Sequence, residues 1–560
     1  MNHRRWKVLP PAPAGFLGEM RLPPVAVQLL YSRGITSPSE AEDFLRMDGG
    51  QQGDPLLLPE MERAVARVYQ ALLRGETIAV YGDFDADGIC GTVVLAEGLS
   101  LLGGNVVPYI PHRVEEGYGL NCVSLDSLCQ QGASLVVTVD CGVGNVREIE
   151  YAQSLGLDVI VTDHHSISHG LPKAFAVVNP KRADSVYPFP QLAGVGVAYK
   201  FLQALFVALG RKDPLDSMLD VVAIGTVADM VPLVGENRTL VKAGLRALSK
   251  TKRLGLIELM RTAGVQPDGV GSEQIAWTVA PRLNAPGRLE HAVAGYRLLV
   301  TDSPDEARQL AQVLEETNTR RQILTNELVA RAKEELSGSW AELPLLMVGG
   351  EHYVSGVVGL VAGKLVEEFY RPSIVYETRE KVSKGSARSI PEFDVVAALG
   401  QCRDLLVRFG GHPMAAGFTV ENRNLPELHQ RLLQIADAEL SLSELQPSMT
   451  VEAELPLAGI NGEVLKLIDK FAPFGTGNPV PVFLSRGAQV TECQAVGNGS
   501  RHLKLKLKQG KVVWRAIGFD LGHLLPEVGQ EIDIVYSFSV DRWGAQDMLE
   551  LNILDFAPVR

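Results

Sequence analysis

The sequence is poor in paired cysteines, in long apolar runs and in positive charge. None of its six cysteines forms a Cys-x-x-Cys pair, which argues against a disulfide framework or a zinc knuckle and favours a reducing compartment. No stretch approaches the roughly 18 apolar residues of a membrane span. The basic start, MNHRRWKVLPPAPAGF, lacks the apolar core of a signal peptide. We therefore expect a cytoplasmic protein without membrane association.

The charge balance is acidic, with 53 Lys and Arg against 66 Asp and Glu and a net charge of −13. A chain of this kind cannot attract nucleic acid through its mean field, so local basic patches must hold any polyanionic partner. Hydrophobic residues make up 46% of the 560 residues, which is typical of globular domains. This length predicts about two to four domains.

Continuous β-branched runs predict buried strands at IAVY (78–81), LVVTV (135–139) and DVIVT (158–162). Helical stretches lie between them. Strands alternating with helices at this spacing predict a parallel, doubly wound α/β sheet.

The remainder of the chain predicts a connector, a second α/β lobe and a barrel. A highly polar helix is expected over about 302–337, where it would join two lobes. A second α/β stretch runs from there to about residue 440. Short alternating strands separated by turn signals follow from about residue 450, and they predict a small β-barrel.

Acidic and imidazole side chains follow the predicted strands directly. The set is Asp85 and Asp87 after the first strand, Asp140 after the second, Asp163, His164 and His165 after the third, and Asp229 after a later apolar stretch. In open α/β sheets ligands bind at the carboxyl ends of the strands, so these groups are expected to converge on one crevice.

A crevice with several carboxylates needs cations, because the acids otherwise repel one another and raise each other's pKa. Carboxylates with an imidazole form a hard, oxygen-rich site suited to Mn²⁺ or Mg²⁺. Two ions about 3.5–4 Å apart are the usual arrangement for phosphoester hydrolysis. A single Asp is more simply a turn residue, and we read Asp83 in that way because Gly82-Asp83 has turn composition.

The segments GDFDADG, VTVDCG, VTDHH and GTVADMVPL resemble the four motifs of the DHH phosphoesterases. Further segments are similar to those of one branch, the RecJ family of bacterial single-strand-specific 5′→3′ DNA exonucleases. They are IPHRVEEGYGLN (110–121), APRLNAPGR (280–288), GSARS (385–389), GGHPMAAGF (410–418) and APFGTGNPVPVF (472–483). The resemblance runs in order from about residue 75 almost to residue 560.

The resemblance implies a two-lobed DHH/DHHA1 parallel-sheet core, joined by a long helix and followed by a C-terminal OB-fold β-barrel. The expected divisions are an N-terminal helical segment (1–50), a DHH catalytic domain (51–300), a connector helix (301–340), a DHHA1 substrate-binding domain (341–445) and an OB-fold domain (446–560).

The resemblance also implies the roles of the crevice residues. Two divalent ions, Mn²⁺ or Mg²⁺, would be bound by Asp85, Asp87, Asp140, His164 and Asp229. His165 would face the scissile phosphate, and Asp163 would orient both histidines.

A substrate clamp is implied by the same resemblance. Its members are Arg113, Tyr118, Arg288, Ser386, Arg388 and His412. Arg113 would bind a phosphate near the 5′ end of the strand, where Tyr118 would stack on a base. A tight turn followed by a buried helix is the plainer interpretation of GGHPMAAG. The chain has His112 where relatives often have Asp, and Gly363-Lys364 where they often have a more basic helix end.

The predicted barrel carries a basic strand. In HLKLKLK the leucines 503, 505 and 507 should point into a core, while Lys504, Lys506 and Lys508 point outward and bind DNA. Trp514, Phe519 and Trp543 could add stacking surfaces. The plainer interpretation is a solvated edge strand, because lysines commonly protect strand edges.

We therefore expect a single-stranded-DNA-specific 5′→3′ exonuclease that releases 5′-mononucleotides by two-metal hydrolysis in DNA repair and recombination. One alternative is a DHH phosphodiesterase for short oligonucleotides or small nucleotides, which the barrel argues against. Another is a non-enzymatic RecJ-derived scaffold, which the intact ligand positions argue against. The expected partners are single-stranded DNA, a single-strand-binding protein and a helicase. We expect a monomer.

Overall fold

The computed structural model describes residues 4–16, 18, 20–46, 52–113, 115–167, 170–211, 215–336, 338, 342–440, 445–541 and 548–559. The chain forms two compact units. We call Gln51–Pro232 with Glu236–Leu445 the core unit, and Met1–Gly50, Leu233–Gly235 and Gln446–Arg560 the barrel unit. In the part of the chain that is described, no helix combines the length and the apolar character needed to cross a membrane.

The core unit begins with a parallel sheet of order β3-β2-β4-β5-β6. Its strands are β2 (Thr77–Gly82), β3 (Asn105–Tyr109), β4 (Ala133–Val139), β5 (Asp158–Thr162) and β6 (Ala176–Val178). Every neighbouring pair is parallel, which confirms the predicted doubly wound sheet. The acids that follow β2, β4 and β5 therefore leave the sheet at one edge.

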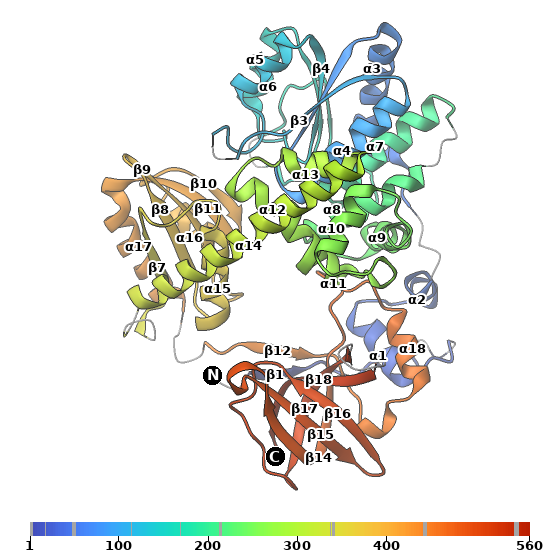
Figure 1. Ribbon diagram of the computed structural model, residues 1–560, viewed down its shortest axis with the longest axis vertical. Coiled ribbons are helices and arrows are strands. Elements are labelled where there is room, and N and C mark those ends of the chain that lie inside the picture. Colours follow the sequence, from blue (N-terminus) through green and yellow to red (C-terminus); the bar gives the residue numbers. More distant parts are fainter. Residues whose placement is uncertain are drawn as a thin grey trace. The chain divides into compact units, whose positions relative to one another are not determined.

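Helices cover both faces of this sheet (Figure 1). They are α3 (Met61–Arg74), α4 (Ala86–Leu101) and α7 (Gly194–Ala208) on one face and α5 (Cys122–Gln130) and α6 (Val146–Ser154) on the other. The middle strands are buried on both sides, as their continuous apolar runs predict.

Further helices follow the sheet and lead into a long one. They are α8 (Leu219–Ala228), α9 (Gly235–Leu248), α10 (Leu254–Thr262), α12 (Ala280–Leu289), α13 (Val293–Val300) and α14 (Pro304–Glu335). Helix α14 starts at its cap Ser303, whose hydroxyl accepts from the Glu306 amide, with Pro304 in the first turn. Its bounds agree to within two residues at each end with the polar helix expected over about 302–337, and it lies inside the wider connector segment 301–340.

The second lobe has a sheet of order β10-β11-β9-β8-β7. Its strands are β7 (Leu346–Gly350), β8 (Ser373–Thr378), β9 (Val382–Arg388), β10 (Leu406–His412) and β11 (Ala415–Glu421). Here the expectation of a parallel sheet needs correction, because only β7 and β8 are parallel. The connections 379–381 and 413–414 are too short for a parallel crossover, so they form hairpins.

Two helix layers cover the second sheet. Helix α15 (Val358–Phe369) packs on one face, and α16 (Val395–Gln401) and α17 (Leu425–Glu439) pack on the other. The segment GGHPMAAG forms the β10–β11 hairpin, so the plainer interpretation of a buried helix is wrong.

The barrel unit contains a closed ring of strands. They are β14 (Phe483–Val496), β15 (His502–Gln509), β16 (Val512–Gly518), β18 (Met548–Pro558) and β17 (Glu531–Asp541), which pairs back to β14. This closure confirms the predicted OB-fold barrel. The leucines 503, 505 and 507 are buried in its core, as their alternation predicts.

The N-terminal segment joins the barrel unit and is not purely helical. Strand β1 (Arg5–Val8) pairs in parallel with β12 (Ser448–Val451). Helices α1 (Pro24–Ser32) and α2 (Pro38–Leu45) contribute Ala26, Leu29, Leu30 and Ala41 to the core that also holds barrel residues.

Candidate metal centre and phosphate clamp

Two carboxylates at the β2–α4 junction are fixed by backbone amides. Asp85 caps α4, and its Oδ1 accepts from the amides of Asp87 (3.0 Å) and Gly88 (3.1 Å). The Asp87 carboxylate accepts from Gly194 (2.7 Å) and Val195 (3.0 Å) at the first turn of α7. These hydrogen bonds hold both carboxylates in place, so the oxygen lone pairs that they leave unused point in fixed directions.

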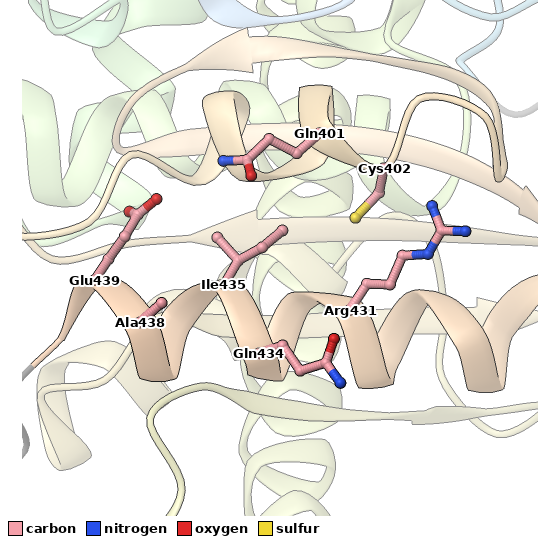
Figure 2. Close-up of a pocket in the computed structure, with 7 residues that line it drawn as sticks. All are labelled: Gln401, Cys402, Arg431, Gln434, Ile435, Ala438 and Glu439. Atoms are coloured by element: carbon pink, nitrogen blue, oxygen red, sulfur yellow. The ribbon is translucent and has the colours of Figure 1, made fainter.

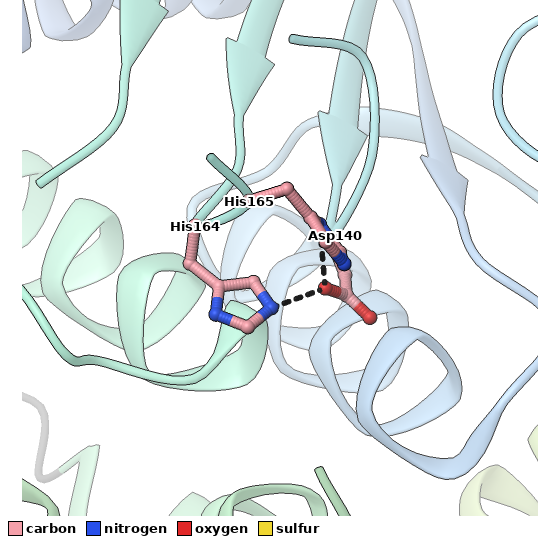
Figure 3. A group of neighbouring side chains, drawn as sticks. All are labelled: Asp140, His164 and His165. Carbon is pink, nitrogen blue, oxygen red and sulfur yellow. Dashed lines mark ion pairs between the residues drawn. The ribbon is translucent and has the colours of Figure 1, made fainter. Parts of the chain in front are cut away.

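Asp140 directly follows β4 and has a strained backbone conformation. Its φ is +60°, which is uncommon for a residue with a side chain and is often found at functional sites. A Cβ on Gly194 would come within 2.6 Å of the Asp140 side chain, so α7 can approach only because Gly194 is glycine. Figure 3 shows that Asp140 Oδ1 faces both histidines, at 3.0 Å from His164 Nε2 and 3.8 Å from His165 Nδ1.

Asp163 orients His165. One oxygen of Asp163 lies 2.8 Å from His165 Nδ1 and accepts from the His164 amide, and the other accepts from the Val143 amide at 2.9 Å. Burial alone would raise the pKa of Asp163, but the hydrogen bond and charge of His165 hold it at about 2. Burial opposes the charge on His165, yet Asp163 raises the His165 pKa above its ordinary value. Asp163 therefore stays ionised and fixes the imidazole.

Four other carboxylates, those of Asp83, Asp87, Asp140 and Asp229, become charged only at a cost in free energy. Burial, followed by the charges of neighbouring carboxylates, raises the pKa of Asp87 to about 7 and that of Asp229 to about 9. The same causes raise the pKa values of Asp83 and Asp140 well above the ordinary range. Burial and the charge of His165 lower the pKa of His164 to about 3, so its imidazole is neutral.

Several of these atoms are buried without a hydrogen-bond partner among the described residues. They are Asp83 Oδ1, Asp140 Oδ1, Asp229 Oδ2 and both ring nitrogens of His164. Ligand atoms converge within 4.8 Å of one another in three groups: Asp140 with His164 and His165, Asp87 with His164 and Asp229, and Asp83 with Asp85 and Asp140. Two of these groups consist of carboxylates with at most one imidazole, and such oxygen-rich sets suit Mn²⁺ or Mg²⁺. The residues present therefore fit the predicted metal ions.

Asp83 is the acid that the sequence interpretation left out. Its side chain is buried, and it shares a group with Asp85 and Asp140. Asp83 is therefore part of the carboxylate cluster and not merely a turn residue. Its position directly after the strand, two residues before Asp85, was the available signal.

A cavity of about 160 Å³ in the core unit gathers most of the predicted clamp. It is lined by Arg113, Arg288, Ser355, Gly356, Val358, Gly359, Lys384, Gly385, Ser386, Arg388 and Gly417. Arg388 Nη1 donates to Ser386 Oγ at 3.0 Å. Burial, followed by the charges of Arg113, Arg321 and Arg388, lowers the pKa of Arg288 to about 9. Guanidinium groups that repel one another in a cavity favour a bound anion. We call this cavity the clamp cavity.

The clamp cavity adjoins the carboxylates. The Arg113 guanidinium lies 4.8 Å from the centre of the ring of Phe84, the residue between Asp83 and Asp85 in the sequence. Burial lowers the pKa of Arg113, and the charges of Asp83 and Asp85 oppose that shift. The arginine side chains of the clamp cavity and the carboxylates are therefore neighbours within the core unit.

Two predicted clamp residues lie outside this cavity. The Tyr118 hydroxyl donates to the Asp140 carbonyl at 3.2 Å and lies 3.3 Å from His165 Nδ1, so Tyr118 belongs beside the carboxylates. His412 lies exposed at the end of β10. Lys384 lines the cavity although the sequence interpretation did not include it. Its alternation with Ser386 and Arg388 along β9 was the signal.

The barrel lysines differ from one another. Lys506 Nζ forms an ion pair of 2.6 Å with Glu492 on β14, whereas the described residues provide no ion-pair partner for Lys504 or Lys508. Trp514 is partly buried against the barrel core and donates from Nε1 to the Leu457 carbonyl. Phe519 is 57% exposed, and Trp543 lies outside the described residues.

A second cavity, of about 370 Å³, lies between α16 and α17 (Figure 2). Its lining includes Cys402 and Arg431, and the Arg431 guanidinium already pairs with Asp404 and Glu427. Both helices cover the face of the second sheet opposite to Ser386 and Arg388. This cavity is therefore separate from the clamp.

Comparisons with known proteins agree with this architecture. Three family models match: the DHH family N-terminal domain over 77–226, the DHHA1 domain over 343–441 and the RecJ OB domain over 451–555. The single-stranded-DNA-specific exonuclease RecJ of Bacillus subtilis strain 168 is 38% identical over 543 residues, which cover 96% of this chain and 68% of that protein.

Two solved structures are similar over most of the chain. The crystal structure of RecJ from Thermus thermophilus in complex with Mn²⁺ has a TM-score of 0.86 at 31% identity, covering 99% of this chain and 80% of that one. The complex with Mg²⁺ from the same organism has a TM-score of 0.79 at 30% identity, covering 99% and 79%. These matches confirm the predicted fold class and the predicted resemblance.

Proposed function

The chain belongs to the RecJ family of single-stranded-DNA-specific exonucleases, and we propose that it degrades single-stranded DNA from the 5′ end and releases 5′-mononucleotides. It is a metal-dependent nuclease. The observation that carries the proposal is that, among the described residues of the core unit, buried ligand atoms without a hydrogen-bond partner lie next to a cavity lined by arginines. This arrangement suits a strand whose terminal phosphate is held in the cavity while a phosphodiester bond of the same strand is cleaved at the metal ions.

Two divalent ions are proposed to bind the carboxylate cluster. Asp85, Asp87, Asp140, His164 and Asp229 would hold them, and Asp83 would complete the group with Asp85 and Asp140. Mn²⁺ or Mg²⁺ bound there would lower the pKa of a water molecule and neutralise charge on the phosphoryl oxygens. The metal complexes of the Thermus thermophilus relative support this choice of ions.

His165 is proposed to act on the scissile phosphate. Its Nδ1 is held by Asp163, which leaves Nε2 to donate to a phosphoryl oxygen. The raised His165 pKa favours the protonated form that such a donor needs. The Tyr118 hydroxyl also lies beside Nδ1, and its half-exposed ring can stack on the neighbouring base.

The clamp cavity is proposed to select the strand end. Its volume suits a phosphate group and is below the usual range for a drug-sized ligand. Arg113, Arg288, Ser386 and Arg388 supply donors that can bind a terminal phosphate from several sides. We place His412 at the rim of this face.

The remaining assignments are part of the same proposal. The barrel would bind the strand farther from its end through Lys504 and Lys508, with Lys506 contributing once it leaves Glu492.

We propose a cytoplasmic monomer that acts in DNA repair and recombination with a single-strand-binding protein and a helicase. The catalytic and substrate-binding lobes would correspond to 51–300 and 341–445.

A length and polarity series tests this function. Single strands labelled at the 5′ or 3′ end, the matching duplex and dinucleotides would be incubated with Mn²⁺, Mg²⁺ or EDTA. We expect 5′-mononucleotides from single strands, little product from duplex and none in EDTA. Preferential cleavage of dinucleotides would instead indicate a small-nucleotide phosphodiesterase, and hydrolysis of nothing would indicate a scaffold.

A further inference from the structure

The cationic face of the second sheet continues beyond the clamp cavity. Arg388, Ser386 and Lys384 alternate along β9 and so share one face. Arg388 marks the inner end, because it lines the clamp cavity together with Arg113. Burial lowers the pKa of Arg388, and the charge of Arg113 adds to that shift. Lys384, which also lines the clamp cavity, marks the outer end, about 13 Å farther along the strand at about 3.3 Å per residue.

A second cation lies across the sheet from Lys384. Lys384 on β9 pairs in register with Thr419 on β11, which pairs with Arg408 on β10. With strands about 4.8 Å apart, the Lys384 and Arg408 backbones are about 10 Å apart, within reach of one bound group. No ion pair involves either side chain within the described ranges. Glu377 lies opposite Lys384 on β8, but it is engaged by Arg379 and the Ser355 hydroxyl.

The sheet surface beside Lys384 and Arg408 is formed by glycines, which have no side chains. Gly417 and Gly410 are neighbours on β11 and β10, on the same face as Ser386. A Cβ on Gly410 would meet nothing within 4 Å, and one on Gly417 would meet only the Gly385 carbonyl at 3.9 Å. Neither glycine has a positive φ. Neither packing nor backbone conformation requires glycine here, whereas a ligand lying on the sheet would.

We propose that Lys384, Thr419 and Arg408 form an outer phosphate subsite for the additional phosphates of a 5′-triphosphorylated strand. This inference rests on the proposed function, in which the clamp cavity holds the 5′-terminal phosphate. In that arrangement the rest of the strand runs from the terminal phosphate towards the carboxylates. A group attached to the terminal phosphate on its other side must therefore be a substituent of the 5′ end itself. Two cations with a hydroxyl between them suit the added negative charge, and the glycine surface gives it access.

The test compares three oligodeoxynucleotides of one sequence that carry a 5′-hydroxyl, a 5′-monophosphate or a 5′-triphosphate. The full chain would be assayed with Mn²⁺ as wild type, as Lys384→Gln/Arg408→Gln and as Arg403→Gln, an exposed arginine near α16 on the other side of the sheet. The readout is the ratio of kcat/KM for the triphosphate to kcat/KM for the monophosphate. We expect the double variant to lower this ratio at least about tenfold and Arg403→Gln to leave it unchanged.

An unchanged ratio in the double variant would overturn the subsite, whatever happens to the absolute rates. Calorimetric titration of the metal-free full chain with inorganic tripolyphosphate gives a second readout, and the double variant should bind it more weakly than wild type. Equal binding would likewise contradict the inference. If wild type degrades none of the three strands, the proposed function fails, while the tripolyphosphate titration still decides the subsite.

Discussion

At the scale of single residues, Asp83 shows how the carboxylate cluster depends on its environment. Its Oδ1 is buried and has no hydrogen-bond partner among the described residues, close to ligand atoms of Asp85 and Asp140. Burial and the charge of Asp85 raise the pKa of Asp83 well above its ordinary range. A carboxylate in that setting is stabilised in its charged form by a nearby cation.

We therefore predict that Asp83→Asn weakens Mn²⁺ binding by about 10- to 100-fold, as the loss of a residue that supports a metal site usually does. Calorimetric titration with Mn²⁺ measures the effect directly. Asp302→Asn, at an exposed position, is the matched control and should bind Mn²⁺ like wild type. Wild-type affinity in Asp83→Asn would return Asp83 to the role of a turn residue.

The sequence shows which side chains follow the predicted strands, but it does not show which way each of these side chains points. Asp85, Asp87 and Asp140 could be found because each closely follows a buried strand. Asp83 could not be distinguished from a turn residue, since neither its burial nor its unpaired oxygen is visible in sequence. Tyr118 could be noticed as an aromatic residue, but its contact with His165 arises only when the loop after β3 meets the end of β5.

At the scale of helices and strands, the first turn of α7 supports the metal cluster. The Gly194 and Val195 amides hold Asp87, and Gly194 lies against Asp140. We predict that Gly194→Ala lowers both kcat and Mn²⁺ affinity at least about tenfold, because its Cβ would press on the Asp140 side chain and misplace a ligand.

Gly196→Ala provides the control, two residues farther along the same helix. Its Cβ would meet nothing closer than 3.4 Å, so activity should stay close to wild type. Circular dichroism melts would check that both variants fold. Full activity in Gly194→Ala would show that Asp140 can move without cost.

On the barrel, the ion pair between Lys506 and Glu492 predicts unequal contributions from the three lysines. Lys504→Gln and Lys508→Gln should each reduce the slope of log affinity against log salt by about one, as the loss of a phosphate contact does. Lys506→Gln should reduce it less, because Lys506 must first leave Glu492. Fluorescence anisotropy with a labelled single strand between low and moderate salt measures all three. Equal slopes for all variants and wild type would mean that this strand does not contact phosphates.

Element types were largely predictable, while their pairing partners were not. The continuous runs at 78–81, 135–139 and 158–162 predicted parallel strands, and the alternation in β15 predicted its buried leucines. The second lobe shows the limit, because its short connections turn most of the sheet antiparallel. The pairing of β1 with β12 joins residues more than 400 positions apart, which no local pattern indicates.

At the scale of the whole molecule, the N-terminal helices are part of the barrel unit's core. Leu29 is fully buried in the cluster that contains Phe483 and the barrel leucines. We predict that Leu29→Ala lowers the free energy of unfolding by about 2–5 kcal/mol through lost burial and the cavity left behind. Leu525→Ala, in the same unit and 59% exposed in the native protein, is the control and should change stability little. Denaturant unfolding compares them, and equal effects would contradict the shared core.

The net charge of −13 can be interpreted once the charged residues are placed in the folded chain. Part of the acidity lies in the carboxylate cluster, where bound cations would offset it. The positive charge that a strand would meet is local, in the clamp cavity and on β15. The mean charge was therefore a poor guide to the partner. The basic strand and the clamp arginines were already visible in the sequence, and the folded chain shows that the arginines line one cavity.

The most direct test of the central claim is to separate hydrolysis from binding in Asp140→Ala. The carboxylate cluster would lose a group near both histidines, whereas the clamp cavity and the barrel lysines would remain. We predict no detectable hydrolysis of single-stranded DNA in Mn²⁺, with binding of the same strand within about threefold of wild type. Near-normal hydrolysis by this variant in Mn²⁺ would contradict the account.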